Sequence, residues 1–476
     1  MAPERFFLEL DPPSEAMREW PHVVIVGGGF AGLKVCHALA RKPVRVTLID
    51  KRNFNLFQPL LYQVASGLVS EADVASPLRQ MVGQAPNIQI LLGEVVDIDP
   101  AAKEVVFNDH RYGYDHLILA SGSGSTYFGH EEWRPLAPPM KILEHADEIR
   151  RRLLMALEEA EQTRDPERRR FLQSVVVVGA GPAGCELAGS LIELMHRAIR
   201  RDFKQLDHHL CRVVLVDAVE RVLPTMHPKL SAAAAGHLER AGVTLVMRSM
   251  VKGIAPGRVA LDGPEGHREL QAATICWTAG VRASRLGALL AERTGAPVDR
   301  GGRLLVEPDF SIPGHPEIRA VGDLCAYLHT ADGRPLPGMA GPAVQMGAWV
   351  AASILNQNGS LAPFRFTDLG SMAVIGPFYA VADLRGLHVS GLAGWVLWAL
   401  AHLAFIPDTE NRITLFTKWM WQIATRQRTA LLITGRPDQH LGVDVGLYRA
   451  QLHPPEPAAA PAGEVEPADN DLPLAA

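Results

Sequence analysis

The chain has 476 residues, of which 47% are hydrophobic, and its formal net charge at pH 7 is −5. This length accommodates two or three domains with ordinary cores, and the charge balance leaves no basic excess that would favour a nucleic-acid partner. The negative charge is concentrated in residues 451–476, a Pro- and Ala-rich acidic tail without Lys or Arg, which is predicted to be disordered.

The chain begins with a predicted polar arm over residues 1–20, which lacks the continuous apolar stretch of a secretory signal. An apolar run then leads into the glycine loop Gly27–Gly32 (GGGFAG). A buried parallel strand has this composition, and the loop after it lets backbone N–H groups and a helix N-terminus approach a pyrophosphate. The next predicted strand, residues 44–49, ends at Asp50, about 20 residues beyond the loop, where such folds place a ribose-binding acid.

Residues 142–172 are rich in Glu and Arg and are predicted to form a helical connector whose charged surface is solvated. A second apolar run follows and leads into the glycine loop Gly179–Gly184 (GAGPAG). The strand after it ends at Asp217, and the long gap between loop and acid predicts a long helix over about residues 183–204. One such loop is weak evidence, but two in one chain predict two dinucleotides held so that a hydride can pass between them.

The remaining pattern indicates how two dinucleotide-binding units share the chain. Residues 243–280 have the pattern of short strands, the chain returns to the first unit at residues 318–323, and residues 338–356 have the pattern of a helix. The predicted fold class is α/β, with two doubly wound Rossmann-like domains and a C-terminal membrane-associated helical segment. The predicted boundaries are residues 21–145 and 296–387 for the discontinuous first domain, 146–295 for the inserted second domain and 388–450 for the C-terminal helices.

The C-terminal helices are predicted to meet a membrane. The apolar stretch 391–406 is shorter than the roughly 20 residues that a spanning helix needs, so it is expected to lie in or dip into one leaflet. An amphipathic helix over 412–427 is predicted to follow, with Lys418 and Gln422 on its polar side. Its predicted apolar side consists of Ile413, Phe416, Trp419, Met420 and Ile423.

The composition of this region also suits a membrane surface. It holds four of the eight tryptophans and more Arg and Lys than acidic residues, and both features favour the headgroup layer of an anionic leaflet. A dimer interface or a domain core is the alternative explanation of the same apolar residues. The four tryptophans are Trp395, Trp398, Trp419 and Trp421.

The cysteines and histidines predict neither a dithiol nor a metal centre. The cysteines are expected to be reduced and buried in a cytoplasmic protein, which argues against a flavoenzyme that works through a redox pair of thiols. The adjacent His208 and His209 are interpreted as surface residues. No closely spaced pair occurs among the five cysteines, Cys36, Cys185, Cys211, Cys276 and Cys325.

These motifs resemble the two-dinucleotide-binding flavoproteins and, in detail, the type II NADH dehydrogenases, which are single-subunit, non-proton-pumping NADH:quinone oxidoreductases. The resemblance spans about residues 20–440 and implies FAD, NADH and a membrane quinone as cofactors and partner. It also implies a peripheral, monotopic protein on the cytoplasmic face of the cell membrane and a homodimer. The most specific match is residues 56–65 (LFQPLLYQVA), and the others are 46–50, 179–189, 277–281 and 320–323 with the helix after Pro337.

The resemblance assigns roles to the residues of both glycine loops. Asp50 is expected on the adenosine ribose of FAD, and Asp217 on the ribose of NADH, where a carboxylate would repel the 2′-phosphate of NADPH. Glu186 is expected to approach the nicotinamide and the flavin and to assist hydride transfer; a first-turn Glu favoured by the helix dipole is the alternative. The implied FAD-binding residues are Gly27, Gly29, Gly32, Asp50, Gln63 and Asp323. The implied NADH-binding residues are Gly179, Gly181, Gly184, Glu186, Asp217 and Gly280.

The quinone segment departs from the family pattern. Where the family has Ala-Gln-x-Ala-x-Gln-Gln-Gly, this chain has Ala340–Gly347 (AGPAVQMG). Gln345 is kept, and two glutamines are replaced, so the quinone type and even the acceptor stay open. Gln345 and Glu186 are the predicted catalytic residues. The predicted quinone-site residues are Gly341, Pro342, Gln345 and Met346.

Three alternatives remain at this stage. A soluble flavoprotein reductase for a ferredoxin-like partner would share both glycine loops without needing the tryptophan-rich helices. A sulfide:quinone oxidoreductase would share the membrane end but needs cysteines near the flavin, and Cys185 and Cys325 are candidates for such a pair. A flavin-binding redox sensor or scaffold would show no turnover with any quinone.

Overall fold

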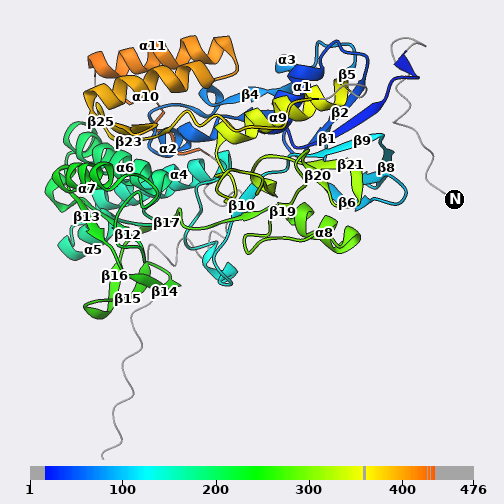
Figure 1. The fold of residues 1–476 in the computed structure, drawn as a ribbon. Helices are drawn as coiled ribbons and strands as arrows, with labels where there is room; N and C mark the ends of the chain where they lie inside the picture. Colours follow the sequence, from blue (N-terminus) through cyan, green and yellow to red (C-terminus); the bar gives the residue numbers. More distant parts are fainter. Residues whose placement is uncertain (1–16, 357–360, 426, 429, 435–476) are drawn as a thin grey trace, which may run out of the picture.

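The computed structural model describes residues 17–356, 361–425, 427–428 and 430–434. The predictions for most of the N-terminal arm, for residues 435–450 and for the acidic tail lie outside these residues. In the described part, two sheets carry the two glycine loops, one parallel throughout and one parallel except for its edge strand β20, and two helices lie side by side along one edge of the molecule (Figure 1). These helices are α10 (Leu392–Phe405) and α11 (Thr409–Thr425).

The first sheet has the strand order β20-β21-β9-β1-β2-β5. Its central strand β1 is parallel to β2 and β9, and Val24 pairs with Thr47 and with Leu117. The side chain of Val24 is fully buried, as expected for a parallel strand covered on both faces. The strands are β1 (His22–Val26), β2 (Arg45–Asp50), β5 (Ile88–Leu92), β9 (His116–Leu119), β20 (Ser311–Ile312) and β21 (His315–Ala320).

Two helices from opposite ends of the chain pack together on this sheet. They are α1 (Phe30–Leu39), which follows the first glycine loop, and α9 (Ala340–Leu355), which confirms the helix predicted over 338–356. A Cβ atom at Gly347 would stand 2.5 Å from the carbonyl oxygen of Ala31, so only glycine permits this close approach. The chain after the second sheet therefore packs with the first sheet, where β21 also pairs with β9.

The second sheet has the order β13-β12-β11-β17, with all neighbours parallel. Val176 on β11 pairs with Val214 on β12, as Val24 pairs with Thr47 in the first sheet. The long helix predicted after the second loop is confirmed as α6 (Pro182–Asp202). The strands are β11 (Ser174–Val178), β12 (Arg212–Val216), β13 (Val243–Val246) and β17 (Thr274–Trp277).

Smaller elements connect and cover these two sheets. The ribbon β10-β18 pairs residues 123–125 of the first unit with residues 281–283, which follow the last strand of the second sheet, and so links the units. The remaining strands are β3 (Phe54–Leu56), β4 (Ala75–Pro77), β6 (Val95–Asp99), β7 (Glu104–Phe107), β8 (His110–Gly113), β10 (Ser123–Ser125), β14 (Met250–Ala255), β15 (Arg258–Gly263), β16 (Gly266–Gln271), β18 (Val281–Ala283), β19 (Leu304–Leu305), β22 (Cys325–Ala326), β23 (Ser371–Gly376), β24 (Tyr379–Leu384) and β25 (Leu387–Gly391). The remaining helices are α2 (Leu61–Ala65), α3 (Leu78–Met81), α5 (Pro166–Leu172), α7 (Pro228–Ala241) and α8 (Arg285–Thr294).

The connector contains α4 (Leu143–Gln162), but the prediction that its charged surface is solvated is wrong for one face. Glu148 is buried between Arg151 and Arg152, whose guanidinium nitrogens lie 2.6–2.9 Å from its carboxylate oxygens. Arg152 also donates to the carbonyl of Leu136 at 2.9 Å. Buried charges are tolerated when they are paired and hydrogen-bonded, so these residues clamp the connector to the preceding loop.

Helix α11 contacts the protein through residues that the amphipathic pattern placed elsewhere. Lys418 and Gln422, predicted on the polar side, bind Asp73 (2.5 Å) and the carbonyl of Leu68. Trp419, predicted on the apolar outer side, is buried. The polar side therefore faces the protein in part, and the placement of Trp419 in the headgroup layer is wrong.

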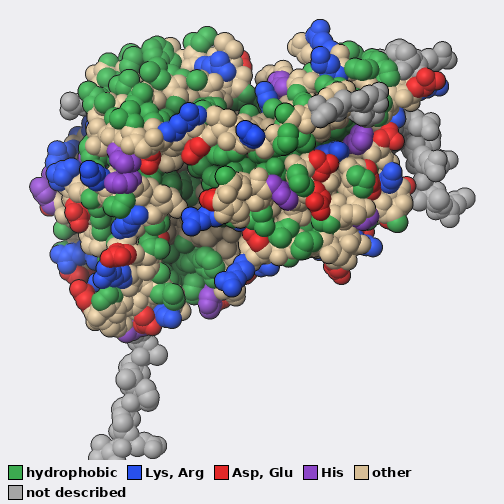
Figure 2. All heavy atoms as spheres, viewed as in Figure 1, with side chains coloured by type: hydrophobic (Ala, Val, Ile, Leu, Met, Phe, Trp, Pro, Cys, Tyr) green, Lys and Arg blue, Asp and Glu red, His purple; other side chains and the backbone are tan. Residues whose placement is uncertain are grey.

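The outward surface of these helices is apolar instead. Figure 2 shows hydrophobic side chains gathered over the corner where Figure 1 places α10 and α11. Trp398 is buried as well, so it too is wrongly assigned to the headgroup layer, whereas Trp421 is 56% exposed. No helix in the described ranges is both long and apolar enough to cross a membrane. We call the exposed residues the outer face: Leu392, Val396, Leu400, Phe405, Ile413, Phe416, Met420 and Trp421.

Candidate functional site

The first glycine loop leaves β1 through Gly27, whose φ of +106° favours glycine. A Cβ atom at Gly32 would stand 1.9 Å from the Gly27 carbonyl oxygen, so loop and helix α1 touch there. Around Gly29, the N-cap of α1, no atom lies within 4 Å of a Cβ position. Asp50 at the end of β2 accepts a hydrogen bond from the Gly28 N–H at 2.5 Å, and burial raises the pKa of Asp50. This arrangement leaves an open helix N-terminus flanked by a carboxylate.

Asp323 lies on the same edge of the first sheet, in the turn that follows β21. Its carboxylate accepts a hydrogen bond from the Ser123 hydroxyl at 2.7 Å and lies 3.5 Å from the Lys141 ammonium group. Gly338 approaches it closely, because a Cβ atom there would stand 3.2 Å from the Asp323 carboxylate. Lys141 and Ser123 lie far from Asp323 in the sequence, and no local pattern in the chain indicates them.

The second glycine loop repeats this geometry. Gly179 has a φ of +111°, and a Cβ atom at Gly184 would stand 1.7 Å from its carbonyl oxygen. Gly181 is the N-cap of α6, and its Cβ position has no atom within 4 Å. Asp217 after β12 accepts a hydrogen bond from the Ala180 N–H at 2.6 Å. Gly280, with a φ of +75°, lies in the strand-end segment beside this loop.

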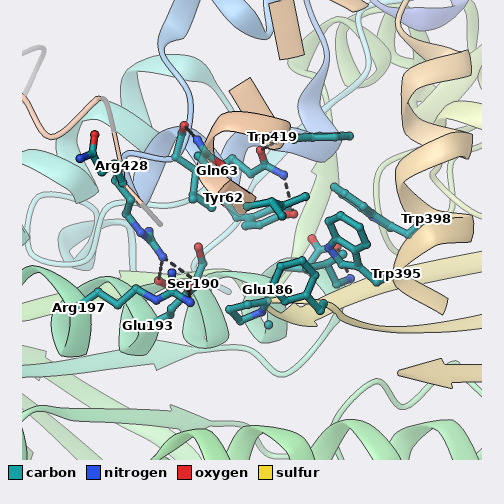
Figure 3. A pocket seen from close by; sticks show the side chains of 18 residues that line it. Tyr62, Gln63, Glu186, Ser190, Glu193, Arg197, Trp395, Trp398, Trp419 and Arg428 are labelled. Carbon is teal, nitrogen blue, oxygen red and sulfur yellow. Dashed lines mark hydrogen bonds and ion pairs between the residues drawn. The ribbon is translucent and has the colours of Figure 1, made fainter. Parts of the chain in front are cut away.

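Helix α6 continues from the second loop into the wall of a cavity of about 110 Å³ (Figure 3). Glu186, Ser190, Glu193 and Arg197 are spaced by four, three and four residues, so they share one face of the helix. The opposite walls come from α2, β23, α10 and α11 and include Tyr62, Gln63, Val374, Trp395, Trp398 and Trp419. The cavity therefore joins the second unit to the C-terminal helices.

Glu186 is a buried acidic residue in the wall of this cavity whose pKa is shifted. Burial raises its pKa to about 8, and the N–H of Val374, 3.3 Å away, offsets this effect only in part. The residue lies in the second turn of α6, because Pro182 begins the helix. The first-turn alternative to a functional role is therefore wrong.

Tyr62 and Gln63 form a polar pair in the opposite wall. The Gln63 amide donates to the Tyr62 hydroxyl and accepts from the Trp419 indole N–H, both at 2.9 Å. Burial and the nearby Glu186 raise the pKa of Tyr62 well above its usual value. This chain of hydrogen bonds fixes Tyr62 and leaves its own proton free for an acceptor in the cavity.

A second polar group closes the far side of the cavity. Arg428, whose side chain is 5% exposed, lies 3.0 Å from Glu193 and donates to the carbonyl of Ser66 at 2.6 Å. Arg197 also pairs with Glu193, at 2.9 Å. The sequence analysis missed these residues and Tyr62; the helical spacing on α6 would have found Glu193 and Arg197, but nothing local indicates Arg428.

None of the four residues predicted to contact quinone lines this cavity. Gly341 and Pro342 lie in the first turn of α9. Both ends of the Gln345 amide bind the backbone of Thr367 at 2.9 Å. Met346 is buried in the core of the first unit, where its sulfur accepts the Gly322 N–H at 3.3 Å.

All five cysteines are free, so no disulfide links any of them. The two candidates for a redox pair lie in different cores, Cys185 with α6 and Cys325 with α9. Burial raises the pKa of Cys325 to about 12 and that of Cys185 further, which disfavours a reactive thiolate in either.

Comparison with known proteins shows which family the chain belongs to. The model of the pyridine nucleotide-disulphide oxidoreductase family matches residues 21–347. The type II NADH:quinone oxidoreductase Ndh of Mycobacterium tuberculosis is 38% identical over 438 residues, covering 89% of this chain and 93% of that protein. NdhA of the same bacterium is 38% identical over 427 residues, covering 87% and 89%. In fold, the chain is similar to NDH2 from Plasmodium falciparum in complex with NADH, with a TM-score of 0.79 at 18% identity over 87% of this chain and 99% of that one.

Proposed function

Because the chain belongs to the type II NADH:quinone oxidoreductases, enzymes that transfer electrons from NADH to quinone, we propose that its first glycine loop holds FAD, its second loop holds NADH, and the cavity of Tyr62 and Glu186 receives the quinone headgroup. One observation carries this proposal: α6 begins at the second loop and continues as the cavity wall. Glu186 lies only about 8 Å along the helix from the loop, so one rigid element joins the two sites.

The residues of the first loop fit FAD. The open space beside Gly29 lets a pyrophosphate reach the N-terminus of α1, and Asp50 stands where ribose hydroxyls can donate to it. Asp323, held by Ser123 and Lys141, presents a carboxylate to the ribityl chain. When bound, the flavin supplies a two-electron carrier between the hydride donor and the quinone.

The second loop fits NADH by the same physical argument. The open space at Gly181 admits the pyrophosphate, and the Asp217 carboxylate accepts hydrogen bonds from the adenosine ribose. A 2′-phosphate at this position would meet that negative charge, so Asp217 favours NADH over NADPH. Gly280, in the strand-end segment beside the loop, has a φ of +75°, and a Cβ atom there would stand 2.4 Å from the Phe128 ring, so a role in NADH binding stays a prediction.

Reduction of a quinone to a quinol takes up two protons together with two electrons, and the cavity offers groups that can supply protons. With its pKa raised to about 8, the Glu186 carboxyl group holds its proton at neutral pH. Tyr62 accepts from Gln63 and, with its pKa raised, keeps its proton, so its hydroxyl can donate a hydrogen bond to a quinone carbonyl oxygen. A quinone contact by Gly341, Pro342, Gln345 or Met346 stays a prediction, and Gln345 would first have to release Thr367.

The outer face of α10 and α11 is proposed to dock on the cytoplasmic membrane surface. Removing one large apolar side chain from water contributes roughly 1.5–3 kcal/mol, so the eight residues of this face suffice for peripheral attachment. The cations contribute less than the sequence predicts, because Lys418 is paired with Asp73 and Arg428 with Glu193. A homodimer stays a prediction.

A Tyr62→Phe variant tests the quinone site. We expect the KM for quinone to rise several-fold while NADH reduces the bound flavin at the wild-type rate, because only the donor to the quinone is lost. Tyr112→Phe is the matched control, since the Tyr112 hydroxyl has no hydrogen-bond partner among the described residues. Unchanged quinone kinetics in Tyr62→Phe, or a defect in the NADH step alone, would contradict the site.

Sedimentation with anionic lipid vesicles tests the docking face. A Leu400→Glu/Ile413→Glu double variant is expected to stay in the supernatant, because both side chains are 62% exposed and their replacement leaves the fold intact. The control is Val96→Glu, an exposed apolar residue on β6 in the first unit. Cosedimentation of the double variant at the wild-type level would place the membrane contact elsewhere.

A further inference from the structure

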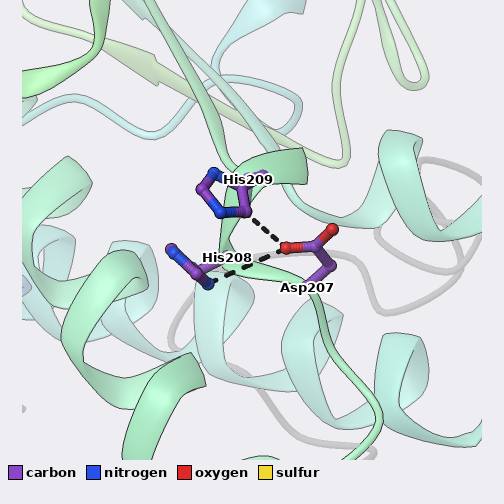
Figure 4. A group of neighbouring side chains, drawn as sticks. All are labelled: Asp207, His208 and His209. Carbon is purple, nitrogen blue, oxygen red and sulfur yellow. Dashed lines mark hydrogen bonds and ion pairs between the residues drawn. The ribbon is translucent and has the colours of Figure 1, made fainter.

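A cluster of metal-binding side chains lies outside the site described above, on the turn between α6 and β12. Asp207, His208 and His209 each offer one ligand atom, and these atoms all lie within 4.8 Å of one another (Figure 4). His209 is exposed and His208 is half-buried, which agrees with their interpretation as surface residues. The turn gathers both imidazoles around one carboxylate.

Contacts within the turn hold these side chains close together. Asp207 caps the short helix of residues 208–210 by accepting the His209 N–H at 2.9 Å, and its carboxylate lies 3.8 Å from the His208 ring nitrogen. The two imidazole rings stand 3.9 Å apart between centroids. Ligand atoms about 2.1 Å from a tetrahedral ion stand about 3.4 Å apart. The ligand atoms of the turn already lie within 4.8 Å of one another, so side-chain rotation needs to bring them only slightly closer.

A third imidazole approaches the cluster from another element. His196 on α6 lies with its ring centroid 6.3 Å from that of His208. The Gln173 side-chain amide, one residue before β11, also donates to the Asp207 carbonyl at 2.8 Å and ties the turn to the second sheet. Imidazole nitrogens with one carboxylate are the donor set that zinc and its neighbours in the first transition row prefer over magnesium or calcium.

We propose that Asp207, His208 and His209 bind one divalent transition-metal ion, with His196 as a further ligand. The ion would link α6 to the turn that begins β12, at the end of the second unit opposite its glycine loop, and so act as a structural clip. Burial lowers the pKa of His196 and of His208, and the nearby positive charge of Arg200 lowers both further. Its positive charge also opposes the bound cation, so we expect weaker binding than in a closed structural zinc site.

Calorimetric titration with zinc chloride tests this proposal, using full-length protein without a histidine tag. We expect one zinc ion per chain, a higher melting temperature in its presence and no binding of magnesium. His208→Ala should weaken zinc binding at least about tenfold, since one of few protein donors is lost, and should abolish the melting shift. His130→Ala is the matched control, because His130 faces a single carboxylate, Glu132 at 3.0 Å.

The outcomes distinguish a metal-binding site from side chains that merely lie close together. The readouts are binding and melting, so they do not depend on the assignment of the flavin, NADH or quinone sites. Wild-type protein that takes up no zinc, or His208→Ala protein that binds zinc as tightly as the wild type, would overturn the proposal.

Discussion

The two glycine loops of this chain are built alike up to their helices and differ beyond them. In each loop the first glycine has a positive φ, the last glycine touches the carbonyl of the first, and an acid accepts the N–H of the second loop residue, at 2.5 Å for Asp50 and 2.6 Å for Asp217. The same backbone cradle thus occurs twice, which is what two pyrophosphates require.

The helices that follow the loops serve different purposes. Helix α1 has 10 residues and packs against α9 within the first unit. Helix α6 has 21 residues and carries Glu186 and Glu193 to the cavity beneath the C-terminal helices. We infer that the first loop only holds its cofactor, whereas the second loop also places the groups that act on the substrates.

Alanine at the last glycine of each loop should give the largest effects and distinguish the two units. The new Cβ atoms would stand 1.9 Å from a carbonyl oxygen in Gly32→Ala and 1.7 Å in Gly184→Ala. Overpacking of this kind costs about 1–3 kcal/mol, or about 5- to 150-fold in affinity. Gly32→Ala is expected to lose flavin on purification, and Gly184→Ala to keep flavin but raise the KM for NADH.

Gly29→Ala is the control for this pair, because a Cβ atom there meets no protein atom within 4 Å. It should fold and melt like the wild type while it binds FAD less tightly, since the new methyl group enters only the pyrophosphate space. Equal flavin content in Gly32→Ala and Gly184→Ala would show that the two loops are not specialised.

Glu186→Gln should have an intermediate effect that appears in the pH dependence. The pKa of Glu186 is raised to about 8 in the folded chain. Between about pH 4 and about pH 8 the folded chain therefore holds a proton that the unfolded chain has released. Wild-type stability therefore falls as pH rises toward about 8, and the variant lacks this loss. The melting temperature of Glu186→Gln relative to wild type should increase between about pH 5 and pH 9.

The same variant also tests the role of Glu186 in turnover. Flavin should remain bound, and oxidation of NADH with quinone as acceptor should be slower, because the variant has no carboxyl proton to supply to the quinone, with a pH profile that no longer changes near about pH 8. A full rate of NADH:quinone turnover with the wild-type pH profile would remove Glu186 from the mechanism and leave α6 with a structural role only.

Replacement of Asp50 or Asp217 by asparagine should give the smallest effects on cofactor binding and still distinguish the two loops. Asp217→Asn removes the charge that opposes a 2′-phosphate, so the preference for NADH over NADPH should fall by about tenfold, or about 1.4 kcal/mol. Asp50→Asn should weaken FAD binding modestly and leave this preference unchanged. Steady-state kinetics with both nucleotides measures the ratio, and an unchanged ratio in Asp217→Asn would move the ribose site elsewhere.

Much of the fold and of the two loops could be predicted from the sequence because their signals are local. Glycine spacing, apolar runs and a strand-end acid place Asp50, Asp217 and the long helix α6 directly. The cavity could not be predicted, because it depends on contacts between distant segments, such as Trp419 with Gln63.

The errors on α4 and α11 have physical reasons too. Charged residues are rarely buried unless they are paired, and the sequence does not reveal that Arg151 and Arg152 share Glu148. A helical pattern shows that α11 has two sides but not which side packs against the protein. Lys418 and Trp419 both contact the protein.

The central claim is that electrons pass from a nicotinamide at the second loop to a flavin at the first and then to a quinone. Absorption spectra of the purified protein under anaerobic conditions test it most directly. We predict a flavin spectrum that bleaches when NADH is added and returns when a short-chain quinone follows. A protein that is colourless and cannot be reconstituted with FAD, or a flavin that NADH leaves oxidised, would contradict the account.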